Sequence, residues 1–170
     1  MDIKTLVKKA KTLTNIKVFD PTGIPSIDKK HVLPEDLKLF YELCGGIEIY
    51  KDEENPIEIL PPKKVVRANP IIIGEITGMP NNGIPKNDIS EDWYVIACDY
   101  NGDYLTIDLG RDRLGRCYDS FHELHPGNSP IIAKSFTDLL ERLIDNRGQH
   151  WYWLREDFVS LGEAYDDVNE

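Results

Sequence analysis

Three aspartates lie close together in the sequence and have the side-chain type that metal binding or acid–base catalysis requires. They are Asp99, Asp103 and Asp108. Grouped carboxylates bind Ca²⁺ or share a proton in hydrolysis. However, Asp103 follows an Asn-Gly pair, where aspartate is a common turn residue, and Asp108 falls on the more polar face of the expected hairpin. We predict that these acids are structural, and a small hydrolase that uses them is the least favoured hypothesis.

Histidines and cysteines are the other residues that could hold a metal ion. His122 and His125 are three residues apart, whereas a zinc-protease helix needs two histidines four apart on one face. The cysteines are odd in number, include no C-x-x-C pair and lie in apolar contexts; they are Cys44, Cys98 and Cys117. We therefore predict reduced thiols in the core, no metal, no cofactor and no catalytic residue.

The charge of the chain restricts the partners that it can bind. Its 170 residues carry a net charge of −10 at pH 7. Nucleic acids and anionic membranes attract clustered Lys and Arg, so an acidic chain is expected to bind neither. Lysines interrupt the N-terminal segment, and no stretch reaches the roughly 20 apolar residues that cross a bilayer. We expect a cytoplasmic protein whose electrostatically favoured partner is basic.

A hairpin over residues 94–109 is the clearest local signal. Asn101-Gly102 is the pair that a two-residue type I′ turn prefers, because both central residues need positive φ. Folding the chain there pairs Cys98 with Leu105 and places Asp108 on the more polar face. This alternation predicts an antiparallel sheet with one face against the core and the other partly solvated.

Apolar spacing and turn residues give the remaining elements. Helices are expected over residues 3–14, 34–44 and 135–145, and again from Trp151 to Leu161. Ser135 and Asp138 form a capping box at the start of the third helix. Strands are expected at residues 47–50, 57–60 and 115–121. Residues 61–92 are expected to be irregular, with a short helix near 63–68 and a strand at 71–73.

The order of these elements indicates the fold class. Helices come first, strands cluster in the middle and helices close the chain. This order is typical of an α+β fold, here with a mostly antiparallel sheet of about four to six strands and helices at both ends packed on it. Residues 1–150 are expected to form one domain, and residues 151–170 a helical extension with an acidic tail.

Three segments, in this order, resemble the SUKH superfamily, which includes bacterial immunity proteins and the fungal cell-wall assembly regulator. Residues 33–46 resemble the family's Leu-Pro helix that ends in a glycine turn, with Gly45-Gly46 where the family often has Asn-Gly. Residues 96–109 are similar to its central hairpin, and residues 133–140 to its closing Ser-Phe helix. The resemblance implies a sheet covered by helices and a binding role, and it supplies no catalytic residue.

The resemblance implies an immunity protein that neutralises a bacterial toxin, often a nuclease, by direct binding. The alternative is an intracellular scaffold or regulatory adaptor of the same fold. In the first case the acidic surface would dock on a basic toxin domain, with buried aromatic side chains as anchors. The candidate contacts are Glu53, Glu54, Glu91, Asp92, Trp93, Asp99, Tyr104 and Asp112.

Overall fold

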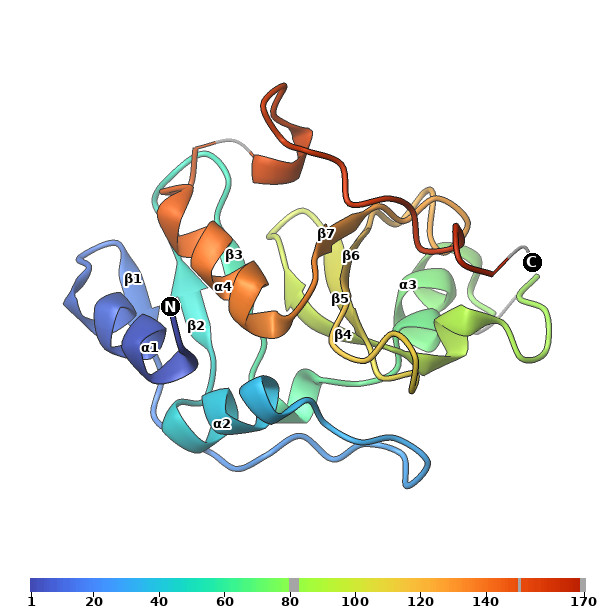
Figure 1. The fold of residues 1–170 in the computed structure, drawn as a ribbon, viewed down its shortest axis with the longest axis horizontal. Coiled ribbons are helices and arrows are strands. Elements are labelled where there is room, and N and C mark those ends of the chain that lie inside the picture. The colour runs from blue at the N-terminus through green and yellow to red at the C-terminus, as the bar shows by residue number, and fades with distance from the viewer. Residues whose placement is uncertain (80–82, 150, 169–170) are drawn as a thin grey trace.

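The computed structural model describes residues 1–79, 83–149 and 151–168, except for the side chains of Glu75 and Ile76. Within these residues seven strands form one antiparallel sheet in sequence order (Figure 1). They are β1 (Ile16–Val18), β2 (Ile47–Ile49), β3 (Ile57–Ile59), β4 (Trp93–Cys98), β5 (Tyr104–Asp108), β6 (Cys117–Ser120) and β7 (Ile131–Ala133). The predicted α+β class is confirmed. The strands exceed the predicted number because the three-residue strands β1 and β7 give no alternating pattern long enough to recognise.

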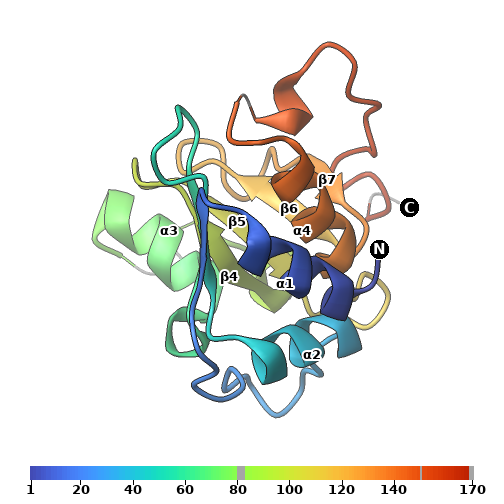
Figure 2. The same cartoon turned by 90° about the vertical axis from the view of Figure 1, so that its left-hand side faces the viewer.

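Helices cover both sides of this sheet. They are α1 (Ile3–Thr12), α2 (Glu35–Leu43), α3 (Ala68–Thr77) and α4 (Phe136–Asp145). Helices α1, α2 and α4 contact one another on one side, whereas α3 packs on β4 from the other side (Figure 2). None of the helices in the described part of the chain is long and apolar enough to cross a membrane.

The helix at residue 135 begins as its sequence predicts. The Ser135 side chain accepts a hydrogen bond from the backbone N–H of Asp138, at 3.1 Å. Such a cap satisfies one of the free N–H groups of the first turn and contributes about 1 kcal/mol. The helix then buries Phe136, Leu139 and Leu140 at helical spacing, so that one apolar stripe faces the core.

The turn between β4 and β5 differs from the predicted type I′ turn. Gly102 has a positive φ of 98°, but Asn101 does not. Instead, the Asp99 carboxylate accepts hydrogen bonds from the backbone N–H groups of Asn101 (2.9 Å) and Asp103 (2.8 Å), which stabilises a loop of three residues. The register shifts as a result, and Cys98 pairs with Tyr104 rather than with Leu105.

The prediction that one face of the hairpin is partly solvated is also wrong. Trp93, Thr106 and Asp108 are each completely buried. Tyr165 of the C-terminal segment packs on this region, with its ring centroid 6.1 Å from that of Trp93. The alternation of apolar and polar residues in a strand indicates which face is more apolar. It does not show whether a segment distant in the sequence will cover the polar face.

The C-terminal segment is irregular rather than helical. Over its described residues, 151–168, one short 3₁₀ turn forms, η3 (Tyr152–Leu154), and turns and bends make up much of the rest. Beyond it, the Ile131 N–H donates to the Gly162 carbonyl (2.9 Å) and the Ala164 N–H donates to the Ser129 carbonyl (3.1 Å). The predicted helix over residues 151–161 is wrong, because its aromatic side chains pack on the sheet region instead of forming one helical stripe.

The segment between β3 and β4 contains a helix where the sequence suggested a strand. Ile71-Ile72-Ile73 lies inside α3, so the predicted strand is wrong. The helix expected near residues 63–68 is a 3₁₀ turn, η1 (Pro62–Lys64), and a second one, η2 (Ile89–Asp92), precedes β4. A short β-branched run is consistent with a buried strand or a buried helix, and periodicity alone does not separate them.

A buried carboxylate joins strands β4, β5 and β6. Asp108 on β5 accepts hydrogen bonds from Trp93 Nε1 on β4 (3.0 Å) and the Tyr118 hydroxyl on β6 (2.9 Å). It also accepts from Arg113 Nε (2.9 Å) and the Gly110 N–H (2.7 Å). These four donors, one of which is the Arg113 guanidinium, offset part of the cost of removing this charge from water, although burial still raises the pKa of Asp108.

Replacement of Asp108 by alanine should destabilise the protein by about 3–5 kcal/mol, because it leaves the Arg113 charge and several donors without their acceptor. Urea unfolding followed by fluorescence measures this change. Asp112→Ala is the matched control, since Asp112 is exposed in the same turn, and it should change the free energy of unfolding by less than about 0.5 kcal/mol. Equal stability of the two variants would contradict the role given to Asp108.

Candidate functional site

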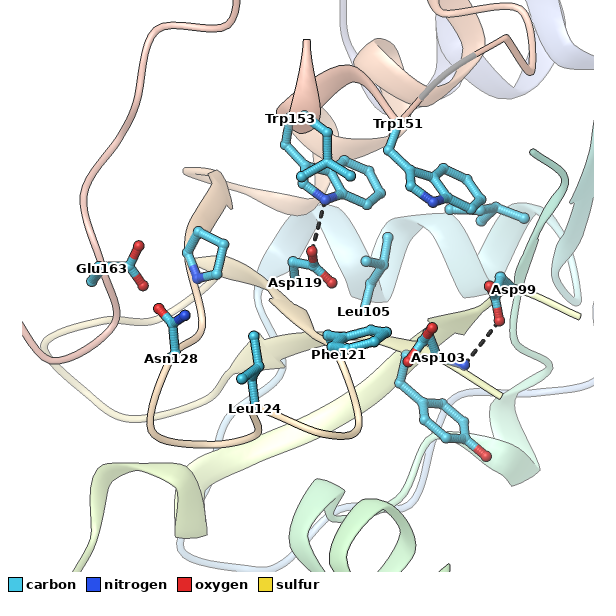
Figure 3. A pocket seen from close by; sticks show the side chains of 14 residues that line it. Asp99, Asp103, Leu105, Asp119, Phe121, Leu124, Asn128, Trp151, Trp153 and Glu163 are labelled. Atoms are coloured by element: carbon cyan, nitrogen blue, oxygen red, sulfur yellow. Dashed lines mark hydrogen bonds between the residues drawn. The ribbon is translucent and has the colours of Figure 1, made fainter. Parts of the chain in front are cut away.

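A cavity of about 440 Å³ lies between strands β5 and β6 and the C-terminal segment (Figure 3). Its carboxylates come from Asp99, Asp103, Asp119 and Glu163. Its apolar walls include Leu105, Phe121, Trp151 and Trp153. Cavities of this size with apolar walls and a few polar groups are typical of binding sites.

Neighbouring strands form the floor of the cavity. Leu105 on β5 pairs directly with Asp119 on β6, so an apolar and an acidic residue occupy adjacent positions of the sheet. Trp151 and Trp153 form the opposite wall, and their rings stack with centroids 5.4 Å apart and planes 9° from parallel. Trp153 Nε1 donates a hydrogen bond of 2.8 Å to Asp119 Oδ2, which fixes this carboxylate relative to the indoles (Figure 3).

The β4–β5 loop supplies two further acids. Asp99 stabilises this loop through its backbone contacts, as described above, and still lines the cavity. Asp103 Oδ1 accepts from the backbone N–H of His122 (3.1 Å) and lies 2.6 Å from His122 Nδ1. The Asp103 carboxylate raises the pKa of His122, since it stabilises the protonated imidazole.

Asp119 has the most perturbed carboxyl group of the cavity. Burial raises its pKa from an ordinary value of 3.8 to about 6, and the nearby Asp103 and Asp99 carboxylates raise it further, against the hydrogen bond from Trp153. Two charges of the same sign and a partly dry site both disfavour the ionised form. Near neutral pH the ionisation of Asp119 in the folded protein therefore lowers the free energy of unfolding.

Three of the four carboxylates of the cavity have no cationic partner in the described part of the chain, whereas Asp103 is paired with His122. Among the residues that the structure describes, no Lys or Arg nitrogen lies within 4.0 Å of the carboxylates of Asp99, Asp119 or Glu163. Glu163 Oε2 is buried and has no hydrogen-bond partner there. Burial and the Asp166 carboxylate both raise the pKa of Glu163. The chemistry of this donor set favours a cation.

Comparison with known proteins gives a family. The model of the SMI1/KNR4 family (SUKH-1) matches residues 28–142. The chain belongs to this family. Immunity protein YokJ of Bacillus subtilis (strain 168) is 47% identical to it over 170 residues, which cover 99% of this chain and 98% of that protein. No solved structure matches the chain.

The SUKH-1 match confirms the predicted resemblance and divides the cavity in two. Asp99, Asp119 and Phe121 lie within the matched residues 28–142, whereas both tryptophans follow them. YokJ, by contrast, aligns with nearly the whole chain, including the C-terminal segment. The family fold therefore provides the acidic floor, and the segment after it provides the aromatic wall.

The predicted contact residues do not form one surface of this SUKH-1 protein. Asp99 and Tyr104 line the cavity, Glu53 and Glu54 are exposed in the β2–β3 turn, and Asp112 is exposed after β5. Glu91 is half-buried in η2. Only Asp99 and Tyr104 are thus brought together at the cavity.

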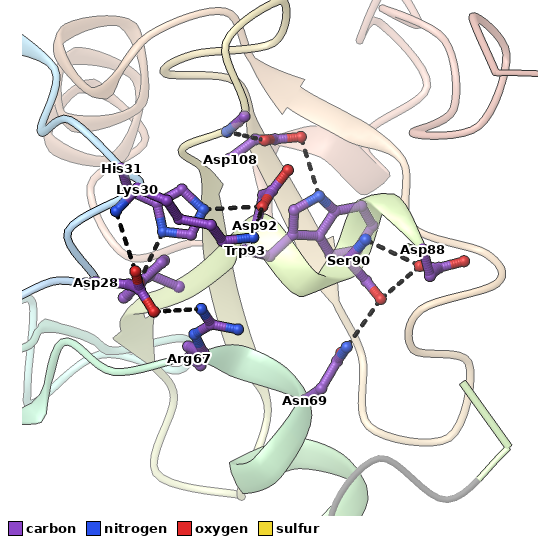
Figure 4. A network of polar contacts seen from close by, with 12 residues as sticks. Asp28, Lys30, His31, Arg67, Asn69, Asp88, Ser90, Asp92, Trp93 and Asp108 are labelled. Carbon is purple, nitrogen blue, oxygen red and sulfur yellow. Dashed lines mark hydrogen bonds and ion pairs between the residues drawn. The ribbon is translucent and has the colours of Figure 1, made fainter. Parts of the chain in front are cut away.

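Asp92 is half-buried and already paired within the chain, and Trp93 lies in the interior. Asp92 lies 2.8 Å from both Lys30 Nζ and His31 Nε2, so its charge is already paired within the chain (Figure 4). Trp93 is completely buried and donates to Asp108 (Figure 4). The prediction of Trp93 as a surface anchor is wrong, because its indole N–H satisfies the buried carboxylate.

The residues considered for catalysis are also separated. Asp108 is closed off from solvent, so it cannot share a substrate with Asp99 and Asp103. His125 is bound to Asn69 Oδ1 at 2.8 Å, and burial lowers its pKa to about 4. Of the residues described by the structure, no three His, Cys, Asp or Glu side chains are placed to hold a metal ion.

Sequence reasoning missed Asp119, Phe121, Trp151, Trp153 and Glu163 as a group. Trp151 and Trp153 flank Tyr152 at the start of the short 3₁₀ turn η3, and no local spacing rule predicts that their rings stack there. The helix expected from Trp151 to Leu161 did not suggest this arrangement.

Replacement of Asp119 by asparagine should stabilise the protein by about 1–2 kcal/mol above pH 6. Asparagine keeps an acceptor for Trp153 but removes the ionisation cost, which is about 1.4 kcal/mol per pKa unit before allowance for solvent screening. Between pH 3.8 and about 6 the folded wild type binds more protons than the unfolded chain, so its stability falls as the pH rises. The advantage of the variant should therefore vanish near pH 4. Urea unfolding at pH 4 and pH 7.5 measures the difference, and a variant less stable than wild type at pH 7.5 would contradict the assignment.

Proposed function

We propose that this chain is an immunity protein that neutralises a toxin by binding it directly in the cytoplasm. The observation that carries the proposal is the 47% identity to immunity protein YokJ across nearly the whole length of both chains. Membership of the SUKH-1 family agrees with it. The chain acts by binding, as a non-enzymatic inhibitor.

The charges of the structure support a basic toxin domain as the partner. The chain has a net charge of −10, and among the described residues no Lys or Arg nitrogen lies within 4.0 Å of the Asp99, Asp119 and Glu163 carboxylates of its largely apolar cavity. A toxin that acts on nucleic acid needs a positively charged surface to hold phosphates, and an acidic protein is attracted to that surface. Binding there would exclude the substrate, so a nuclease domain is the partner class that this chain fits best.

Acids outside the cavity contribute mainly to the rate of association. Glu53, Glu54 and Asp112 are exposed, and exposed charges accelerate encounter without adding much affinity. Asp99 and Tyr104 lie where a partner side chain is enclosed, and enclosed contacts slow dissociation.

Mixing this protein with the toxin encoded beside its gene should abolish the toxin's activity and give a stable complex by size-exclusion chromatography. The association rate should fall steeply between about 50 and 500 mM salt, since screening weakens the attraction of opposite charges. An unrelated acidic protein of similar size and net charge is the control and should leave the toxin active. A toxin that stays fully active, with no complex at low salt, would overturn the proposal for that pair.

A further inference from the structure

The cavity beside the two stacked tryptophans has a composition that selects for one kind of side chain. Its carboxylates attract a positive charge, and its walls of Leu105, Phe121 and the indoles exclude water from whatever enters. A volume of about 440 Å³ admits a long side chain of a partner rather than a whole secondary-structure element. The occupant is therefore cationic, long and able to pack against flat apolar surfaces.

Arginine meets these requirements better than lysine. Its planar guanidinium stacks on aromatic faces, pairs with a carboxylate through two parallel N–H donors and is weakly hydrated. The lysine ammonium is a compact, strongly hydrated charge that would lose its water on entering an apolar cavity. Trp151 and Trp153 stack on each other with ring centroids 5.4 Å apart and planes 9° from parallel, so a guanidinium can lie flat on the outer face of this pair.

An arginine of the chain itself packs on aromatic rings of the same C-terminal segment. The guanidinium carbon of Arg142 on α4 lies 5.6 Å from the ring centroid of Tyr152 and 5.9 Å from that of Phe158. The same C-terminal segment thus binds one arginine within the chain through its aromatic rings. Its two tryptophans line a second aromatic site, next to acids, for which the described residues provide no cation.

We infer that this cavity receives an arginine side chain of the toxin, with the guanidinium stacked on Trp151 and Trp153 and paired with Asp119. The inference rests on the proposed function and names the chemistry of its main contact. The hydrogen bond from Trp153 Nε1 to Asp119 Oδ2 links the acidic floor of the cavity to its aromatic wall, because it holds the carboxylate at the edge of the indole. Asp99 adds charge at the β4–β5 loop.

Affinity for the toxin should depend on Asp119 and Trp151 together. Calorimetric titration should show at least about 30-fold weaker binding for Asp119→Asn, since removal of one member of an enclosed charge pair costs 2 kcal/mol or more. Trp151→Ala should weaken binding about tenfold. The double variant should lose less than the product of the two, because both side chains hold the same guanidinium.

Glu42→Gln is the matched control for net charge. Glu42 is exposed on α2, away from the cavity, and its replacement should change the affinity less than twofold. If the Asp119 and Trp151 variants bind and neutralise the toxin as tightly as wild type, the inference is overturned while the proposed function stands.

A toxin-free measurement separates the two proposals. N-acetyl-arginine amide should shift the indole N–H resonance of Trp153 with a millimolar dissociation constant, and N-acetyl-lysine amide and N-acetyl-norleucine amide should bind at least fivefold more weakly. Asp119→Asn should remove the preference for arginine. Equal responses to the three amides would overturn the arginine site, whereas a clear preference in a chain that fails to bind the toxin would overturn the proposed function alone.

Discussion

The buried Asp108 carboxylate is the interaction on which the arrangement of strands β4, β5 and β6 depends. A charge in the core is tolerated only when donors replace the water that it has lost. Trp93, Tyr118 and Arg113 provide these donors from β4, β6 and the turn after β5. Since they converge on one carboxylate, the three strands are fixed relative to one another, and this fixes the β5–β6 pair that forms the floor of the cavity.

Two acids on adjacent strands differ in the partners that compensate their charge. The fully buried Asp108 has the Arg113 guanidinium as a direct partner, whereas the half-buried Asp119 has one indole N–H and two acidic neighbours. Burial raises the pKa of both carboxyl groups, and among the described residues Asp108 is the one of the two that is paired with a cation. A strongly perturbed group in a cavity is a frequent property of functional sites, because its compensation comes from what binds there. The arginine contact proposed above would give Asp119 the cationic partner that Asp108 already has.

Local signals in the sequence predicted the elements that depend on local interactions. The Ser135 cap, the apolar stripes of α1, α2 and α4 and the strands around the β4–β5 loop follow from spacing and capping within a few residues. The details that failed depend on distant residues. The Asp99 carboxylate replaced the turn that Asn-Gly prefers, and pairing of Gly162 and Ala164 with the β7 region kept the last segment from forming a helix. Both tryptophans of the cavity lie on that segment. The sequence therefore pointed to Asp99 and Tyr104 as contact residues, but it did not point to Asp119 or to the tryptophans beside it.

The division of the cavity between family fold and C-terminal segment suggests how specificity arises in this protein. Long-range attraction between an acidic chain and a basic domain is insensitive to detail, because it depends on summed charge over the Debye length. If the proposed partner is basic, such attraction would bring many basic proteins to the acidic surface without holding any of them. Discrimination between partners requires a contact that a wrong partner fails to make. A wrong partner would leave the enclosed carboxylate without a cation, and that loss costs binding free energy. The tryptophans after residue 142 shape that contact, so changes in a segment outside the family match can alter the choice of partner while the sheet below stays the same.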